Sequence, residues 1–115
     1  MPRPPRPRVL FVEAIEESSL IRMGVWRSVR GALWACPIEE IPPEIPVQVP
    51  EWPIAERRRH YKGGIYVVLH RECRILNRRG PHVLYRDANG THWLCPRDNF
   101  DGEASPGVAR FALLS

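Results

Sequence analysis

Basic side chains are concentrated in one part of this sequence, where their types and spacing suit the recognition of acidic groups. Residues 57–86 contain nine Arg or Lys residues and one acidic residue, Glu72, so this segment has a net charge of +8. An arginine guanidinium presents a planar pair of donors that matches the oxygens of a carboxylate or a phosphate. The candidate partner-binding residues are Arg57, Arg58, Arg59, Lys62, Arg71, Arg74, Arg78, Arg79, Tyr85 and Arg86.

Three interpretations of this basic segment are open. Its arginines can pair with carboxylates on an acidic protein surface, or they can bind nucleic acid with the interleaved tyrosines as stacking platforms. It can also be a solvated face that only aids solubility. We predict the first: a non-catalytic binding or structural adaptor that docks on an acidic protein partner. A nucleic-acid-binding module is the alternative. If residues 78–79 lie opposite residues 57–59, one electropositive edge results.

A second basic segment is a short arm at residues 1–7, in which proline and arginine alternate. Prolines at this density favour the polyproline II conformation. Such an arm can dock in an aromatic groove of a partner or lie along phosphates. The basic side chains of the arm are Arg3, Arg6 and Arg8, of which Arg8 directly follows residues 1–7.

Histidine and cysteine form two pairs with the spacing His-x-x-Cys, His70 with Cys73 and His92 with Cys95. This spacing resembles that of paired zinc knuckles. A regular strand, however, places His92 and Cys95 on opposite faces, and Cys36 stands in an equivalent position in a segment without histidines. We therefore interpret Cys36 and Cys95 as small buried hydrophobic residues. We expect no metal site and no cofactor.

Nucleophilic catalysis has little support in the sequence. Cys73 is flanked by Arg71 and Arg74, which could stabilise its thiolate, but no recognisable catalytic signature surrounds it. The glycines after Lys62 lack the spacing of a phosphate-binding loop and are more typical of the start of a strand. We therefore predict that the protein is not an enzyme.

An internal repeat orders the elements that must position these side chains. When the chain is shifted by 59 residues without gaps, eight of 33 aligned positions are identical. The motif Trp-x-Cys-Pro falls at the same register in both copies, and Trp and Cys are rare residues. The identical pairs are Val9/Val68, Leu10/Leu69, Glu13/Glu72, Arg27/Arg86, Gly31/Gly90, Trp34/Trp93, Cys36/Cys95 and Pro37/Pro96.

Each copy has the same predicted order of elements: an apolar strand, a polar bend, a hairpin and a short helical turn. The strands at residues 9–12 and 65–69 are rich in β-branched and aromatic residues. Asn89-Gly90 favours a type I′ hairpin turn, and Arg30-Gly31 takes its place in the first copy. A proline ends the third strand of each copy, and Ile41 or Phe100 closes the helical turn as an apolar plug.

The second copy resembles a short bacterial protein family. The segments that carry the resemblance are His60-Tyr-Lys-Gly-Gly-Ile-Tyr-Val-Val-Leu69, Val83-Leu-Tyr-Arg86 and Trp93-Leu-Cys-Pro-Arg-Asp-Asn-Phe100. They are similar to the pattern of the family catalogued as domain of unknown function 1653, over roughly residues 57–104. The turn at residues 70–74 departs from that pattern. The resemblance implies a small SH3-like β-barrel with no known activity.

The first copy, residues 25–41, resembles the SH3-like tail at the end of retroelement integrases. The shared features are a tryptophan strand, an Arg-Gly turn and an ending in which proline and glutamate follow cysteine. This resemblance implies a barrel more than it implies DNA handling.

These observations lead to a predicted fold class. We expect a mostly β protein made of tandem SH3-like small β-barrels, or half-barrels, from an internal duplication and joined by a proline-rich linker. Each copy has about 40 residues, fewer than usually sustain a core, so the copies should pack together or on a partner. The expected parts are a basic arm at 1–7, a first β repeat at 8–41, a linker at 42–56 and a second barrel at 57–115.

The composition narrows the class of protein further. The 115 residues include 13 prolines and eight glycines, and the longest stretches without either are too short and too polar to span a bilayer. Three cysteines argue for a reducing compartment. Residues 1–56 carry a net charge of −2 and residues 57–115 carry +6, so an acidic partner should meet the second half. We expect a protein without a membrane partner, cytoplasmic in a bacterial host or virion-associated, within a larger assembly.

Overall fold

The computed structural model describes residues 7–48, 51–52 and 56–114, and more than half of these residues lie in strands. The predicted mostly β class is confirmed. Within the described ranges, no helix is long and apolar enough to cross a membrane. The elements are β1 (Pro7–Glu16), β2 (Arg22–Ser28), β3 (Leu33–Pro37), η1 (Ile38–Glu40), β4 (Glu56–His60), β5 (Ile65–Ile75), β6 (Pro81–Arg86), β7 (His92–Pro96), α1 (Arg97–Phe100), β8 (Glu103–Ser105), β9 (Val108–Ala109) and β10 (Phe111–Leu113).

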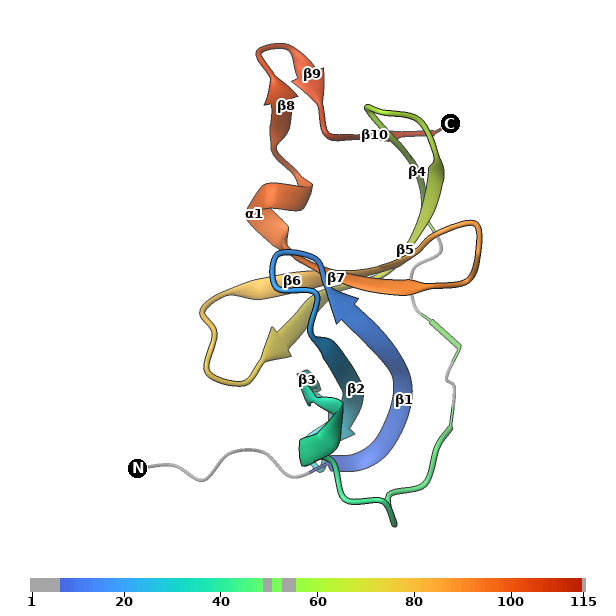
Figure 1. The fold of residues 1–115 in the computed structure, drawn as a ribbon, viewed down its shortest axis with the longest axis vertical. Helices are drawn as coiled ribbons and strands as arrows, with labels where there is room; N and C mark the ends of the chain where they lie inside the picture. The colour runs from blue at the N-terminus through green and yellow to red at the C-terminus, as the bar shows by residue number, and fades with distance from the viewer. Residues whose placement is uncertain (1–6, 49–50, 53–55, 115) are drawn as a thin grey trace.

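Six of these strands close into a barrel (Figure 1). Their order around the barrel is β5-β3-β2-β1-β7-β6, and β6 pairs again with β5. Two neighbouring pairs, β1 with β7 and β3 with β5, are parallel, whereas the others are antiparallel. Strands β4 and β10 extend the sheet beyond the first half of β5, and β8 and β9 form a small hairpin.

The two sequence copies contribute matching sets of elements. Strands β1 to β3 are followed by η1, and strands β5 to β7 are followed by α1. The third strand of each set ends at Pro37 or Pro96, as the sequence predicted. The expected tandem arrangement is not confirmed, because both parallel pairs join a strand of one copy to a strand of the other. A single copy is too small to enclose a core, and the two copies instead form one barrel.

The two hairpins within the copies share a loop that differs from the predicted type I′ turn. Gly31 has φ of +84° and Gly90 has φ of +85°, but the residue before each glycine does not have positive φ. The amide of Gly90 donates to the carbonyl of Asp87, and the Asp87 carboxylate accepts the amides of Asn89 and Thr91. The aspartate side chain therefore organises the second loop, with one glycine in the left-handed region.

Apolar side chains from all six barrel strands fill the interior. Fully burying a Leu or Ile side chain stabilises a fold by about 1.5–3 kcal/mol, and residues from both copies are needed to enclose this core. The buried members are Val9, Phe11, Ala14, Met23, Val25, Leu33, Ala35, Leu69, Cys73, Ile75, Leu84 and Leu94.

Each copy also has an outer cluster associated with its short helix. In the first copy Trp26, Cys36 and Ile41 are buried together. The corresponding cluster of the second copy contains Val68, Val83, Tyr85, Cys95, Phe100 and Phe111. The predicted plugs are confirmed, because Ile41 and Phe100 are only 9% and 1% exposed. The predicted core role of Cys36 and Cys95 is confirmed as well.

Part of the expected linker is attached to the barrel. The amide of Leu10 donates to the carbonyl of Pro46, and the amide of Gln48 donates to the carbonyl of Leu10. Trp52 packs edge-on against Phe11, with ring centroids 5.6 Å apart. Residues 46–48 and Trp52 therefore attach this segment to the barrel. Residues 49–50 and 53–55 lie outside the described part of the chain.

Candidate functional site

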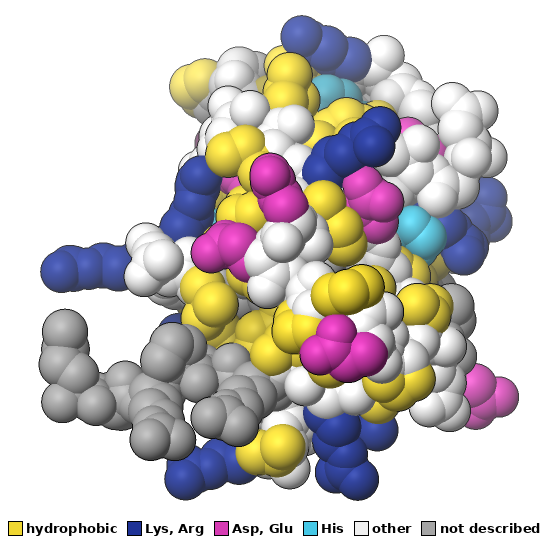
Figure 2. All heavy atoms as spheres, turned by 60° about the horizontal axis from the view of Figure 1, so that its bottom comes forward, with side chains coloured by type: hydrophobic (Ala, Val, Ile, Leu, Met, Phe, Trp, Pro, Cys, Tyr) yellow, Lys and Arg dark blue, Asp and Glu magenta, His cyan; other side chains and the backbone are white. Residues whose placement is uncertain are grey.

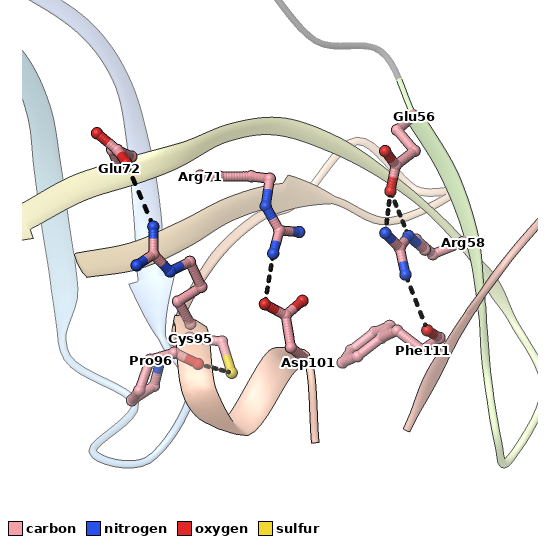
Figure 3. Close-up of polar contacts among 9 residues, drawn as sticks. Glu56, Arg58, Arg71, Glu72, Cys95, Pro96, Asp101 and Phe111 are labelled. Atoms are coloured by element: carbon pink, nitrogen blue, oxygen red, sulfur yellow. Dashed lines mark hydrogen bonds and ion pairs between the residues drawn. The ribbon is translucent and has the colours of Figure 1, made fainter. Parts of the chain in front are cut away.

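Two of the predicted partner-binding arginines are engaged within the chain, close to α1 (Figure 3). Arg58 pairs with Glu56 and donates to the carbonyl of Phe111 at 3.3 Å. Arg71 pairs with Asp101 at 2.5 Å. Both guanidinium carbons lie 5.9 Å from the centre of the Phe100 ring. These two arginines are therefore committed to contacts at the outer cluster of the second copy.

Arg78 also has a partner within the chain, and it lies in the turn that follows β5. Its guanidinium lies 3.7 Å from the carboxylate of Glu16, whose side chain is fully buried. The same carboxylate accepts hydrogen bonds from the hydroxyl groups of Ser18 and Ser19 and from the Ser19 amide. Arg78 thus connects the turn after β5 to the turn after β1.

Tyr85 does not lie among exposed basic groups as the sequence predicted. It is 4% exposed, and its hydroxyl donates to Glu17 at 2.7 Å. Burial, followed by the hydrogen bond to Glu17, raises the pKa of Tyr85 above its ordinary value. The ring packs against Phe111 and Tyr66 in the outer cluster. Tyr85 is therefore a core residue in this structure.

Three other predicted residues are placed apart from one another. Lys62 lies in the turn between β4 and β5, with its ammonium 5.6 Å from the centre of the Tyr61 ring. Arg74 is exposed near the end of β5, and Arg79 is exposed in the turn that follows β5. That turn and β4 lie at opposite ends of β5 (Figure 1). The single electropositive edge that required residues 78–79 opposite 57–59 is therefore not formed.

The remaining predicted arginines come together on one face of the sheet. Arg57 on β4 and Arg86 on β6 are both paired with Val67 on β5, so the three side chains lie in one row. Arg59 has the same orientation as Arg57, two residues along β4, and is paired with Ile65. We call Arg57, Arg59 and Arg86, with Ile65 and Val67 between them, the arginine face.

The arginine face borders an open depression. Arg57, Arg86, Ile65 and Val67 line it, together with the hairpin loop at 87–90. Arg57 and Arg59 are exposed and Arg86 is half-buried. None of the ion pairs formed among the described residues involves any of these three arginines. Their guanidinium groups are thus predicted binding groups that lie together and take part in none of these ion pairs.

One carboxylate, that of Asp87, also borders the depression but is committed to its own loop. It accepts hydrogen bonds from two amides and, at 3.1 Å, from the indole N–H of Trp93. Burial acts to raise the pKa of Asp87, but these hydrogen bonds outweigh it and leave the pKa below its ordinary value. Asp87 therefore stays ionised and shapes the wall of the depression.

Figure 2 shows how the charged side chains are distributed over one side of the molecule. On the side of the molecule seen in Figure 2, most Lys and Arg side chains lie around the rim, and acidic and hydrophobic side chains occupy the middle. Arg8 is exposed at the start of β1. Arg3 and Arg6, the other predicted residues of the arm, lie outside the described residues.

Two arginines that the sequence analysis did not select also have defined partners. Arg97 lies 3.3 Å from Glu72, and Arg110 donates to Glu17 at 2.5 Å. Arg110 and Glu17 are far apart in the sequence, so no local pattern indicated this pair. Ile65 and Val67 form the apolar floor of the depression. They were predicted as strand residues, but not as part of a site.

The three cysteines are all free thiols and all buried. Cys73 lies inside the barrel, where burial raises the pKa of its thiol, so the flanking arginines do not stabilise a thiolate. Burial is also the main cause that raises the pKa of Cys95, to about 12. In the described part of the chain, no three His, Cys, Asp or Glu side chains are grouped so as to hold a metal ion.

Comparisons of the chain with protein-family models, with curated proteins and with solved structures found no match. The fold and the site define a six-stranded, mostly β barrel with an arginine-lined sheet face.

Proposed function

We propose that this chain is a non-catalytic binding module that docks on an acidic segment of a partner protein through the arginine face. The observation that carries the proposal is the row formed by Arg57, Val67 and Arg86 across three neighbouring strands. Two guanidinium groups flank an apolar side chain, at a span of about two strand spacings, or roughly 10 Å. An extended peptide with carboxylates two residues before and two residues after an apolar residue presents all three side chains on one face and matches this arrangement.

The orientation of the aromatic side chains favours a protein partner over nucleic acid. Single strands bind best where aromatic rings stand beside basic groups. Tyr66 and Tyr85, which the sequence interleaves with the arginines, belong instead to the outer cluster on the other side of the sheet. The floor of the arginine face is formed by aliphatic side chains, Ile65 and Val67, which suit an apolar peptide side chain.

The same proposal includes the origin of the fold. We infer that the two copies derive from a duplication, since matching strands and short helices follow one another in the same order at a shift of 59 residues. The resemblances to domain of unknown function 1653 and to integrase-type SH3-like tails remain part of this proposal. They add a barrel relationship and no activity.

Fluorescence anisotropy tests the proposed function directly. The full chain is titrated into a labelled peptide in which Glu and Val take turns at every second position with Ser between them, a matched peptide with Lys in place of Glu, and a labelled oligothymidylate. The site variant is R57E/R86E. The matched control is R30E/R79E, which makes the same charge change at two exposed arginines in other loops. Circular dichroism confirms that each variant retains the wild-type fold.

We expect the wild type and R30E/R79E to bind the Glu and Val peptide, and R57E/R86E to lose about tenfold or more in affinity. Binding should weaken as salt is raised, because exposed charges are screened. Equal peptide binding by both variants would contradict the proposal. Binding of oligothymidylate in preference to the peptide, lost in R57E/R86E, would assign this face to nucleic acid instead.

A further inference from the structure

The acidic residues of the first half of the chain, residues 1–56, fall into two sets. Four of them are paired within the chain: Glu13 with Arg22, Glu16 with Arg78, Glu17 with Arg110 and Glu56 with Arg58. The other set is exposed and takes part in none of the ion pairs formed among the described residues. It consists of Glu39, Glu40, Glu44 and Glu51.

Three members of the second set stand on a short, well-anchored segment, residues 39–48, which we call the acidic segment. Glu39 and Glu40 are in η1, and the buried plug Ile41 fixes this helix over Trp26 and Cys36. Further along, Pro46 and Gln48 form backbone hydrogen bonds with Leu10. The segment therefore presents its carboxylates without a large loss of conformational freedom on binding.

The acidic segment matches the arginine face in both charge and polarity. Val47, on the acidic segment, is 69% exposed, and Glu44 precedes it by three residues. The arginine face places guanidinium groups on both sides of Val67. Each surface thus combines unpaired charge with an apolar side chain, and the charges are opposite.

Within one molecule these two surfaces do not meet. The acidic segment covers the outer side of the first copy, whereas the arginine face lies on strands β4 to β6 of the second (Figure 1). No ion pair connects them among the described residues. The arginine face can therefore meet an acidic segment only on another molecule.

We propose that the arginine face binds the acidic segment of a second copy of this chain, so that molecules associate head to tail. The proposal rests on the proposed function and names its acidic partner. Because the two surfaces differ, the contact is heterologous, and an associated pair of molecules keeps one free arginine face and one free acidic segment. Repetition of the contact builds a chain of molecules or a closed ring. Exposed ion pairs are individually weak, so association is concentration-dependent and sensitive to salt.

Sedimentation velocity of the full chain over a range of concentrations tests this association. In low salt, about 50 mM, we expect the average mass to rise above the 13.3 kDa of one chain with increasing concentration. In high salt, about 500 mM, it should return to the mass of a single chain. A mass of one chain at every concentration in low salt would overturn the proposal.

Charge reversal on each surface identifies the contact. R57E/R86E removes the arginine face, E40K/E44K removes the acidic segment, and each variant alone should sediment as a single chain. Mixing the two should restore association, because each supplies the surface that the other has lost. R30E/R79E is the control and should associate like the wild type. Association that persists in both surface variants would place the contact elsewhere.

The outcomes separate this inference from the proposed function. If the wild type stays a single chain but still binds the Glu and Val peptide through Arg57 and Arg86, self-association is wrong and the binding function stands. If R57E/R86E associates and binds the peptide as well as the wild type does, both proposals fail.

Discussion

Arg110 donates a hydrogen bond of 2.5 Å to the carboxylate of Glu17 and thereby ties the segment between β9 and β10 to the turn that follows β1. The other oxygen of that carboxylate accepts the hydroxyl proton of Tyr85 at 2.7 Å. A second nitrogen of Arg110 lies 3.4 Å from the sulfur of Cys95. One carboxylate from the first copy is therefore enclosed by three groups from the second.

We expect Arg110→Met to destabilise the fold by about 1–3 kcal/mol, because Glu17 loses a charged partner while it stays largely buried. Urea unfolding followed by circular dichroism measures this loss. Arg22→Met is the matched control: its pair with Glu13 is exposed and should contribute about 0–1 kcal/mol. Equal destabilisation by the two substitutions would show that the Arg110 pair has no special role.

The buried carboxylate of Glu16 predicts a loss of stability in acid. Burial acts to raise its pKa, but hydrogen bonds from Ser18 and Ser19 outweigh this effect and leave the pKa below 4.5. The folded state therefore binds a proton less readily than the unfolded state. The contribution of Glu16 is fully present above pH 4.5 and disappears as the pH falls through the lowered value.

Urea unfolding of the wild type and Glu16→Gln at a series of pH values checks this prediction. The wild type should lose stability below about pH 4.5, and the variant, less stable at neutral pH, should lose less of it over the same range. Ser19→Ala removes one of the hydrogen-bond donors and should give an intermediate pH dependence. If the free energy of unfolding depends on pH in the same way in the wild type and in Glu16→Gln, other carboxyl groups cause the loss of stability in acid.

The three thiols should be unreactive in the folded protein. Cys36, Cys73 and Cys95 are no more than 3% exposed, and burial is the first cause of the raised pKa of each. Reaction with an aromatic disulfide reagent requires an accessible thiolate. We expect negligible reaction under native conditions and three equivalents in urea. Fast reaction of one thiol in the native protein would contradict the burial of that residue.

Local chemistry explains which parts of the fold the sequence predicts. The ends of β3 and β7 were predicted because Pro37 and Pro96 cannot donate to a strand ladder, and the plugs Ile41 and Phe100 because apolar residues close a polar turn. The type of the hairpin loop was predicted wrongly. The side chain of Asp87 organises the turn by accepting the Asn89 amide, and Asn89 does not have the positive φ that a type I′ turn requires.

Long-range pairing explains which parts the sequence does not predict. The parallel pairs β1–β7 and β3–β5 join strands that are far apart in the chain, and no local pattern specifies them. Arg58 and Arg71 were predicted as binding residues because they fall in the basic segment 57–86, but Asp101 and the Phe111 carbonyl approach them only after folding. Arg57 and Arg86 were selected for the same reason, and their common row depends on the register of β5.

Gly24 on β2 lies against Ile41 of the outer cluster of the first copy. A methyl group at this position would lie 2.0 Å from Cδ1 of Ile41 and 3.0 Å from Cδ1 of Ile38. Ile41 is buried, so it has little room to move. We expect Gly24→Ala to destabilise the protein by about 1–3 kcal/mol through overpacking, and to loosen the base of the acidic segment.

A double-mutant cycle tests whether this packing is the cause. Ile41→Ala alone leaves a cavity and costs about 2–5 kcal/mol, but in the double variant the new methyl group meets no Ile41 side chain. G24A/I41A should therefore be more stable than the sum of the single substitutions predicts, with a coupling of about 1 kcal/mol or more. Strictly additive losses of unfolding free energy would mean that Gly24 is needed for its backbone conformation and not for the space that it leaves to Ile41.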